Sequence, residues 1–332
     1  MDVDIGSRLP GGPGHLGPGC GPAPPGAARG GLAGGARVER GTGGAGVTGE
    51  FVKLGGVAHH VVVEGAGPVL VLSAGLGMSW FDWDPVVPLL TAHRTVVRFD
   101  RPGHGLSGPA PVPPSAAGEA RRIAGLLDAL GLAGPAAVVG HSVAGFHAEA
   151  FARLYPARTA GLVLVDSSIE ERARPPAAPA LRPALARAAA ALLCRAGVPA
   201  ALGPALRRAT VRAARAGGGD PAPRELVRRC YGTSRVLRGM LLENATYGSV
   251  AAELLYLRRR LPLPSVPVTV VAGGAGGPAW TARQRALASA LGARFQLASG
   301  AGHLVMLDAP GVVAGAVSPT PPLPATLRGE SS

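Results

Sequence analysis

Residues 135–145 read PAAVVGHSVAG. The valine-rich run before Gly140 is typical of a buried strand, and apolar residues at helical spacing begin directly after the stretch. A strand, a one-residue corner and a helix make the turn that presents a nucleophilic serine. We therefore expect Ser142 to adopt a positive φ and to hold its Oγ above the sheet, next to the positive end of a helix.

The residues two positions either side of such a serine must be small. Gly140 meets this requirement, whereas Ala144 adds one methyl group to the strict Gly-x-Ser-x-Gly pattern. Gly145 follows directly and keeps the start of the helix narrow. We interpret the stretch as a tolerated variant of the same turn.

Apolar runs alternate with helical patterns on both sides of this turn. Strands are predicted at 51–54, 58–63, 69–72, 95–99, 137–139, 162–165, 266–271 and 294–297, the first two as a hairpin. Helices are predicted at 80–90, 116–130, 181–196, 223–242, 280–291 and from 308 onward. This alternation predicts an α/β fold, with a mostly parallel sheet covered by helices on both faces.

The alternation stops between residues 169 and 260, where Ala, Leu and Arg with proline breaks predict several helices. We expect this insertion after the sixth strand to form a helical cap over the carboxyl ends of the strands, where open α/β sheets bind ligands. The core then comprises 47–168 and 261–317. The stretches 1–46 and 318–332 are rich in Gly and Pro and are predicted to be disordered tails.

The net charge of +13 suggests a nucleic-acid partner, but the composition argues against one. All basic residues except Lys53 are arginine, and aromatic residues make up only 4% of the chain, which leaves few platforms for base stacking. The predicted cap contains 17 Arg against 6 Asp and Glu. Its basic surface would favour anionic substrates or a membrane surface, or it consists simply of solvated helix faces.

Targeting and metal signals are weak. No run of 18 or more uncharged apolar residues is evident, so no integral membrane segment is predicted. The first residues lack the basic start and apolar run of a signal peptide, and we expect a cytoplasmic protein. Cys20, Cys194 and Cys230 show no spacing typical of a disulfide framework or a zinc site, and no metal or cofactor is predicted.

Four stretches, in this order, resemble the α/β-hydrolase family. They are the loop at 75–77, the segment DRPGHGLS at 100–107, the serine turn, and Gly302-His303. The resemblance covers roughly residues 49–316. It implies a metal-free serine hydrolase that cleaves an ester of a small, apolar acyl substrate through an acyl-enzyme. A serine nucleophile argues against epoxide hydrolases and haloalkane dehalogenases, which use Asp in this fold.

The resemblance implies Ser142 as nucleophile and His303 as its base. The family usually places the acid that orients the base after the seventh strand, but the loop 273–278 here holds no carboxylate. Some relatives use an acid after the sixth strand, where Asp166 stands directly at the strand end. We therefore assign the acid to Asp166, with Glu170 or Glu171 as the fallback.

Two further assignments follow from the resemblance. The backbone N–H groups of Val143 and Leu76 are expected to form the oxyanion hole, and Ala74 stands where the family has a supporting His. Asp308 lies too close to His303 in sequence to be its partner and is interpreted as a helix N-cap.

Several alternatives remain open. The missing late-strand acid and the two alanine replacements also fit a non-catalytic relative that acts as a ligand-binding module. Hydrolysis of thioesters, lactones or carbon–carbon bonds, and cofactor-free haloperoxidase activity, would use the same residues.

Overall fold

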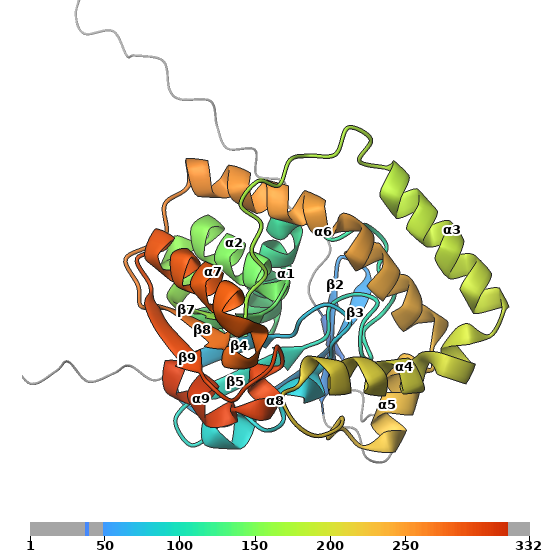
Figure 1. The fold of residues 1–332 in the computed structure, drawn as a ribbon, viewed down its shortest axis with the longest axis horizontal. Helices are drawn as coiled ribbons and strands as arrows, with labels where there is room; N and C mark the ends of the chain where they lie inside the picture. Colours follow the sequence, from blue (N-terminus) through green and yellow to red (C-terminus); the bar gives the residue numbers. More distant parts are fainter. Residues whose placement is uncertain (1–36, 40–48, 318–332) are drawn as a thin grey trace, which may run out of the picture. The chain divides into compact units, whose positions relative to one another are not determined.

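A computed structural model describes residues 37–39 and 49–317 (Figure 1). Its centre is a nine-stranded sheet with the order β1-β2-β3-β5-β4-β6-β7-β8-β9. The strands are β1 (Arg37–Glu39), β2 (Glu50–Leu54), β3 (Val57–Glu64), β4 (Val69–Ser73), β5 (Thr95–Phe99), β6 (Ala136–His141), β7 (Thr159–Val165), β8 (Val268–Gly273) and β9 (Arg294–Ala298). The neighbouring strands β1, β2, β3 and β5 pair antiparallel. From β5 across β4, β6, β7 and β8 to β9, all neighbouring strands pair parallel. The predicted fold class is confirmed.

Nine α-helices and four short 3-10 helices are described. The α-helices are α1 (Ala116–Ala129), α2 (Ala144–Leu154), α3 (Leu181–Arg195), α4 (Val198–Ala214), α5 (Arg224–Tyr231), α6 (Ser234–Arg260), α7 (Gly277–Ala290), α8 (Val305–Asp308) and α9 (Pro310–Val317). The 3-10 helices are η1 (Trp80–Trp83), η2 (Val87–Leu89), η3 (Pro156–Arg158) and η4 (Gly274–Gly276).

The central parallel strands β4, β6, β7 and β8 are mostly apolar on both faces because both faces are covered. On β7, Leu162 and Leu164 pack with α1, α2 and α7 in one core layer, whereas Val163 and Val165 pack with η1, α8 and α9 in the other. Successive strand side chains point to opposite faces, so a strand between two helical layers needs an unbroken apolar run. This explains why β4, β6, β7 and β8 are readable from sequence.

Two helix predictions differ from the structure. The expected helix at 80–90 consists of η1 and η2, separated by Asp84 to Val86. The expected helix at 223–242 breaks at Gly232 and Thr233, where the Thr233 hydroxyl accepts a hydrogen bond from the Val236 amide and starts α6. Threonine is a favourable N-cap residue, so a new helix begins directly after it.

The helices α3 to α6 occupy the segment expected to form the cap. Its last helix, α6, is 27 residues long, and its second half packs through Val250, Leu254 and Leu257 into the core layer of α1 and α2. The single helix therefore belongs to both parts, and the expected boundary at residue 260 falls at its end. Among the described residues no single helix is long and apolar enough to span a membrane; α3 and α4 reach that length and hydropathy only as a pair bent by 107°.

Strand β1 lies within the stretch 1–46 that was expected to be disordered. Arg37 to Glu39 pair antiparallel with β2, with Arg37 opposite Lys53. The expectation thus differs from the structure for these three residues, because backbone pairing with an existing sheet edge needs no large apolar side chains. The remainder of that stretch, residues 47 and 48, and residues 318–332 lie outside the described residues.

Candidate active site

The turn between β6 and α2 has the geometry expected from its sequence. Ser142 has a φ of 53°, and its amide donates to the carbonyl of Val165 at 3.1 Å. A Cβ on Gly140 would lie 2.3 Å from the Ala144 carbonyl oxygen, and one on Gly145 would lie 2.0 Å from the Ser167 hydroxyl. Glycine is therefore required at 140 and 145, whereas the methyl group of Ala144 is accommodated, which supports our interpretation of the variant pattern.

Asp166 and His303 meet as expected. Asp166 follows β7 with a φ of 41°, and its Oδ2 accepts a hydrogen bond from the His303 Nδ1 at 2.7 Å. Its Oδ1 accepts two more, from the Gly273 amide and from the Trp280 indole Nε1, each at 2.8 Å. Three donors converge on a carboxylate that is 2% exposed. These three hydrogen bonds fix the orientation of the carboxylate.

The sequence did not identify two of these donors. The loop 273–278, which lacks the usual carboxylate, supplies the Gly273 amide to a carboxylate from the neighbouring strand. Trp280, expected only as a helix residue, adds its indole N–H. A buried indole N–H usually finds an acceptor, but no sequence pattern says which one.

The fallback acids face other partners. The carboxylate of Glu171 lies 3.8 Å from Arg283, and both side chains are largely exposed. Glu170 lies near Tyr247, where burial and, to a smaller extent, the Glu170 charge raise the pKa of the tyrosine hydroxyl. The Nδ1 of His303 is instead directed to Asp166.

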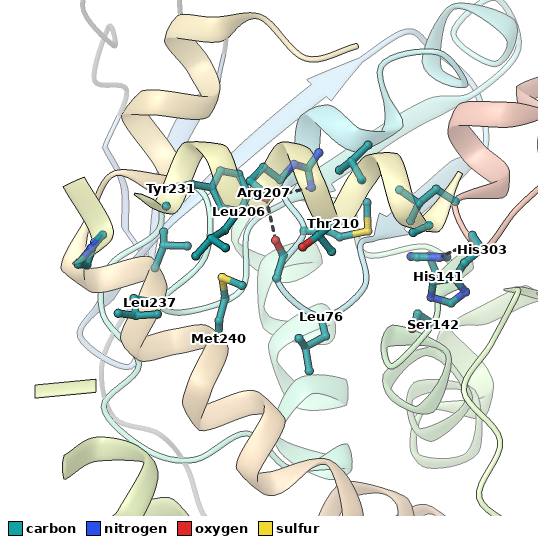
Figure 2. A pocket seen from close by; sticks show the side chains of 18 of the residues that line it. Leu76, His141, Ser142, Leu206, Arg207, Thr210, Tyr231, Leu237, Met240 and His303 are labelled. Carbon is teal, nitrogen blue, oxygen red and sulfur yellow. Dashed lines mark hydrogen bonds between the residues drawn. The ribbon is translucent and has the colours of Figure 1, made fainter. Parts of the chain in front are cut away.

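Figure 2 shows Ser142, His141 and His303 together on one side of a cavity. The His141 Nε2 donates to the backbone carbonyl of His303 at 3.0 Å, and the two ring centroids are 4.7 Å apart. Burial and the neighbouring His303 hold the pKa of His141 well below its usual range. His141 therefore stays neutral and anchors the main chain of His303.

The loop after β4 is held through its carbonyl oxygens. The Met78 amide bonds the Gly75 carbonyl at 3.1 Å, with Gly77 at a φ of 68° completing the turn. Arg101 donates to the carbonyls of Ala74 and Gly75, and the Tyr231 hydroxyl donates to that of Gly77 at 2.8 Å. These bonds give the loop a rigid backbone without the histidine that Ala74 replaces.

The two expected oxyanion donors lie at this loop and at the serine turn. Leu76 lines the same cavity as Ser142. The amide of Val143 precedes α2, where the first N–H groups of a helix have no partner within the helix. Both amides come from backbone segments whose conformation is fixed by hydrogen bonds.

The segment 100–107 contributes a buried ionic cluster. Arg101 bonds both carboxylate oxygens of Glu243 on α6, at 2.8 and 3.0 Å, and the His104 Nε2 lies 3.1 Å from the same carboxylate. Burial alone would raise the pKa of Glu243, but Arg101 and His104 outweigh it and hold that pKa well below its usual range. The guanidinium thus links the loop after β4 to the cap helix.

We predict that Glu243→Ala lowers the free energy of unfolding by about 3–5 kcal/mol, because Arg101 is left buried without its counter-charge. Urea unfolding measures this. A double variant, Arg101→Met with Glu243→Leu, should recover much of that loss, since it removes both charges. A loss as large in the double variant as in Glu243→Ala would contradict this account.

His147 on α2 is buried, and neither ring nitrogen has a hydrogen-bond partner among the described residues. Burial lowers its pKa to about 4, and Arg101 adds to this effect while Glu119 opposes it. As the pH falls, the His147 ring therefore binds a proton near pH 6.5 in the unfolded chain but only near pH 4 in the folded chain. Stability contributed by the neutral ring is complete above pH 6.5 and falls as the pH is lowered.

We predict that His147→Leu removes this part of the acid sensitivity. Between pH 7 and pH 4, the free energy of unfolding should fall by about 3 kcal/mol less in the variant than in the wild type. Urea unfolding across this range measures it. His93→Leu is the matched control, because the exposed His93 is solvated in both states. Parallel curves for wild type and His147→Leu would disprove the assignment.

Asp308 is not the helix N-cap that was expected. It ends α8, and its Oδ2 accepts from the Gly302 amide at 2.9 Å and the Ala216 amide at 2.8 Å. Its Oδ1 accepts from the Arg215 Nε at 2.7 Å. The carboxylate therefore ties the corner before His303 to the end of α4, a contact that only the folded chain creates.

The cavity beside Ser142 has a volume of about 170 Å³ and a mainly apolar wall from the loop after β4, from α4 and from α6. An engineered apolar cavity of about 150 Å³ binds benzene, so this one has room for a group of similar size. Figure 2 shows Leu76, Leu206 and Met240 on the wall, with Arg207 and Tyr231 away from the catalytic side.

Arg207 is the main charged group of this wall. Its guanidinium is paired with Asp82, and its Nε lies 3.1 Å from Asp220. It also lies over the ring of Tyr231, 5.1 Å from the centroid. Two carboxylates already occupy the guanidinium, so the wall offers no free positive charge to a substrate. Within the described residues no group of three or more His, Cys, Asp or Glu side chains is arranged to hold a metal ion.

A model of the alpha/beta hydrolase family matches residues 69–316, which include the serine turn, Asp166 and His303. The chain belongs to the alpha/beta hydrolase family. The match spans the sheet from β4 to β9 and the whole helical insertion, so the family assignment rests on most of the described chain.

Individual relatives of this alpha/beta hydrolase either share low sequence identity with it or match it over only part of their length. RutD of Azorhizobium caulinodans, named as a carbamate hydrolase, is 36% identical over 104 residues, which are 31% of this chain and 39% of RutD. The polyketide synthase ThaQ of Burkholderia thailandensis is 32% identical over 80% of this chain, but only 12% of ThaQ is matched. Cfl2 of Burkholderia cenocepacia shares the fold, with a TM-score of 0.65, 23% identity and coverage of 80% of this chain and 93% of Cfl2.

Proposed function

We propose that this protein is a serine hydrolase that cleaves a carboxylic ester or a related acyl bond with Ser142, His303 and Asp166. The observation that carries the proposal is the hydrogen bond of 2.7 Å between His303 Nδ1 and Asp166 Oδ2, with His303 beside Ser142 in one cavity. This hydrogen bond places the Nδ1 proton on the Asp166 side and leaves Nε2 to act as the base.

The steps follow from these roles. The Ser142 Oγ attacks the carbonyl carbon while the His303 Nε2 takes the hydroxyl proton. The amides of Val143 and Leu76 donate to the oxyanion that forms, and the intermediate collapses as His303 gives its proton to the departing alcohol. Water then attacks the acyl-enzyme with His303 again as base. This releases the acid and restores Ser142.

The cavity supports an uncharged, apolar substrate group. Its wall is mainly apolar, and Arg207 is already paired with Asp82 and Asp220. A carbamate is the second candidate, since RutD is named for that reaction and a carbamate has the same type of acyl carbon. The same three residues would carry out both reactions.

A fluorophosphonate probe tests the proposal, because it reacts covalently with activated serines. We expect labelling of the wild type that disappears in Ser142→Ala and in His303→Ala. Ser168→Ala is the matched control, since Ser168 touches Ser142 only through its backbone amide, and it should keep full labelling. A folded wild-type protein that takes up no label would favour the non-catalytic ligand-binding module.

A further inference from the structure

Exposed apolar side chains gather on two consecutive cap helices. Ten large hydrophobic residues are exposed in the described part of the chain, and half of them lie on α3 and α4. They are Leu181, Leu185, Leu192, Leu202 and Leu206, each more than half exposed. Exposed apolar residues scattered singly need no explanation, whereas a concentration of this kind indicates an interaction surface.

The leucines are arranged along the faces of the helices. On α3, Leu185 lies one turn after Leu181, and Leu192 lies two turns further on the same face. The opposite side of α3, with Pro183 and Ala190, is buried. Figure 1 shows α3 along the outer side of α6, and α6 is the helix that it contacts most extensively. The leucine face therefore has no partner within the described chain.

The charge of this surface is of one sign. Residues 172–219 contain nine arginines and no Asp or Glu. Arg207 and Arg215 are paired with Asp82 and Asp308, and six of the other seven are exposed. On α3, Arg182 and Arg195 flank the leucine face, one on either side. An exposed apolar face bordered by arginines is the pattern of a helix that lies in the interface of a membrane, with leucines in the acyl boundary and guanidinium groups at anionic headgroups.

We propose that the surface of α3 and α4 binds the surface of an anionic phospholipid membrane. A second copy of this chain fits less well, because two arginine-rich surfaces without acids would face each other. A nucleic acid would use the arginines but would leave the exposed leucines in water.

The cavity opens at the α4 part of this surface. Leu206 and Thr210, one turn apart on α4, are both exposed and both line the cavity that contains Ser142. An α4 surface seated on a membrane would therefore place the mouth of the cavity against lipid. This consequence rests on the proposed function: an apolar ester dissolved in the membrane could pass to Ser142 without crossing bulk water.

Co-flotation of the full chain with vesicles tests the docking. We expect binding to vesicles of phosphatidylcholine mixed with phosphatidylglycerol, and much weaker binding to phosphatidylcholine alone. The double variant Leu185→Gln with Leu192→Gln should lose at least about tenfold in partitioning, since two leucines leave the apolar phase. Arg182→Gln with Arg195→Gln should lose about fivefold for each charge. Leu89→Gln, a residue 52% exposed outside the cap, should bind like the wild type.

Three results with vesicles would overturn the proposal. They are no binding to either vesicle, equal binding to both, or unchanged binding of the Leu185 and Leu192 double variant. Tighter binding to duplex DNA than to anionic vesicles would also overturn it, in favour of the nucleic-acid partner. Hydrolysis of a soluble ester, measured on the same samples, separates the two proposals: vesicle binding without hydrolysis removes the proposed function only, and hydrolysis without vesicle binding removes the docking only.

Discussion

Ser142→Ala is expected to lower kcat for ester hydrolysis by on the order of 10⁶, the loss seen when a triad nucleophile is removed. The alanine has no hydroxyl and cannot form the acyl-enzyme, although the amides of Val143 and Leu76 are retained. Steady-state hydrolysis of p-nitrophenyl esters of increasing chain length measures the loss and also reports how long an acyl group the cavity accepts.

Ser142→Gly is the control that separates chemistry from folding. The backbone of Ser142 lies at a φ of 53°, where a side chain costs roughly 1–3 kcal/mol and glycine does not. The glycine variant should therefore be inactive and yet at least as stable as the wild type in urea unfolding. Activity of either variant within tenfold of the wild type would show that Ser142 is not the nucleophile.

Asp166→Asn is expected to lower kcat/KM by on the order of 10⁴, the effect of replacing the acid of such a triad by its amide. Asparagine can still accept from the Gly273 amide and Trp280, but its own NH₂ group then faces His303. The ring must present an acceptor at Nδ1, so its proton moves to the side of Ser142 and the base is lost. The φ of 41° at Asp166 suits asparagine as well as aspartate, so the fold should be kept.

The matched control is Glu171→Gln, at the exposed carboxylate near Arg283. It should leave kcat/KM unchanged. Trp280→Phe, which removes one donor to Asp166 Oδ1, should give a smaller loss than Asp166→Asn, because the bonds from Gly273 and His303 remain. If the kcat/KM of Asp166→Asn stays within threefold of the wild-type value, Asp166 does not orient His303.

Local patterns were sufficient for the parallel strands and for the serine turn. A strand covered on both faces must be apolar throughout, so β4, β6 and β7 could be recognised without knowing their neighbours. The turn at Ser142 is equally local, because the clash that excludes larger residues at 140 involves the Ala144 carbonyl only four positions away.

The helical insertion was only partly predictable. Its position after β7 followed from the interruption of the alternating pattern, and α3 was expected nearly as observed. The length of α6 was not, because the packing of its second half on α1 and α2 depends on the tertiary fold. Asp308 was misjudged for the same reason: its partners at Gly302, Arg215 and Ala216 come together only when α4 meets the corner before His303.

The sequence alone therefore determined the class of fold and the conformation at Ser142, and it predicted Asp166, with Glu170 or Glu171 as the fallback, as the acid that orients His303. The tertiary structure decided that Asp166 meets His303, that Gly273 and Trp280 hold Asp166, and that Arg101 connects the loop after β4 with Glu243. The reason is physical. Strand burial and turn sterics act between residues near in sequence, whereas hydrogen bonds and ion pairs between distant side chains depend on which strand ends and helices the fold makes adjacent.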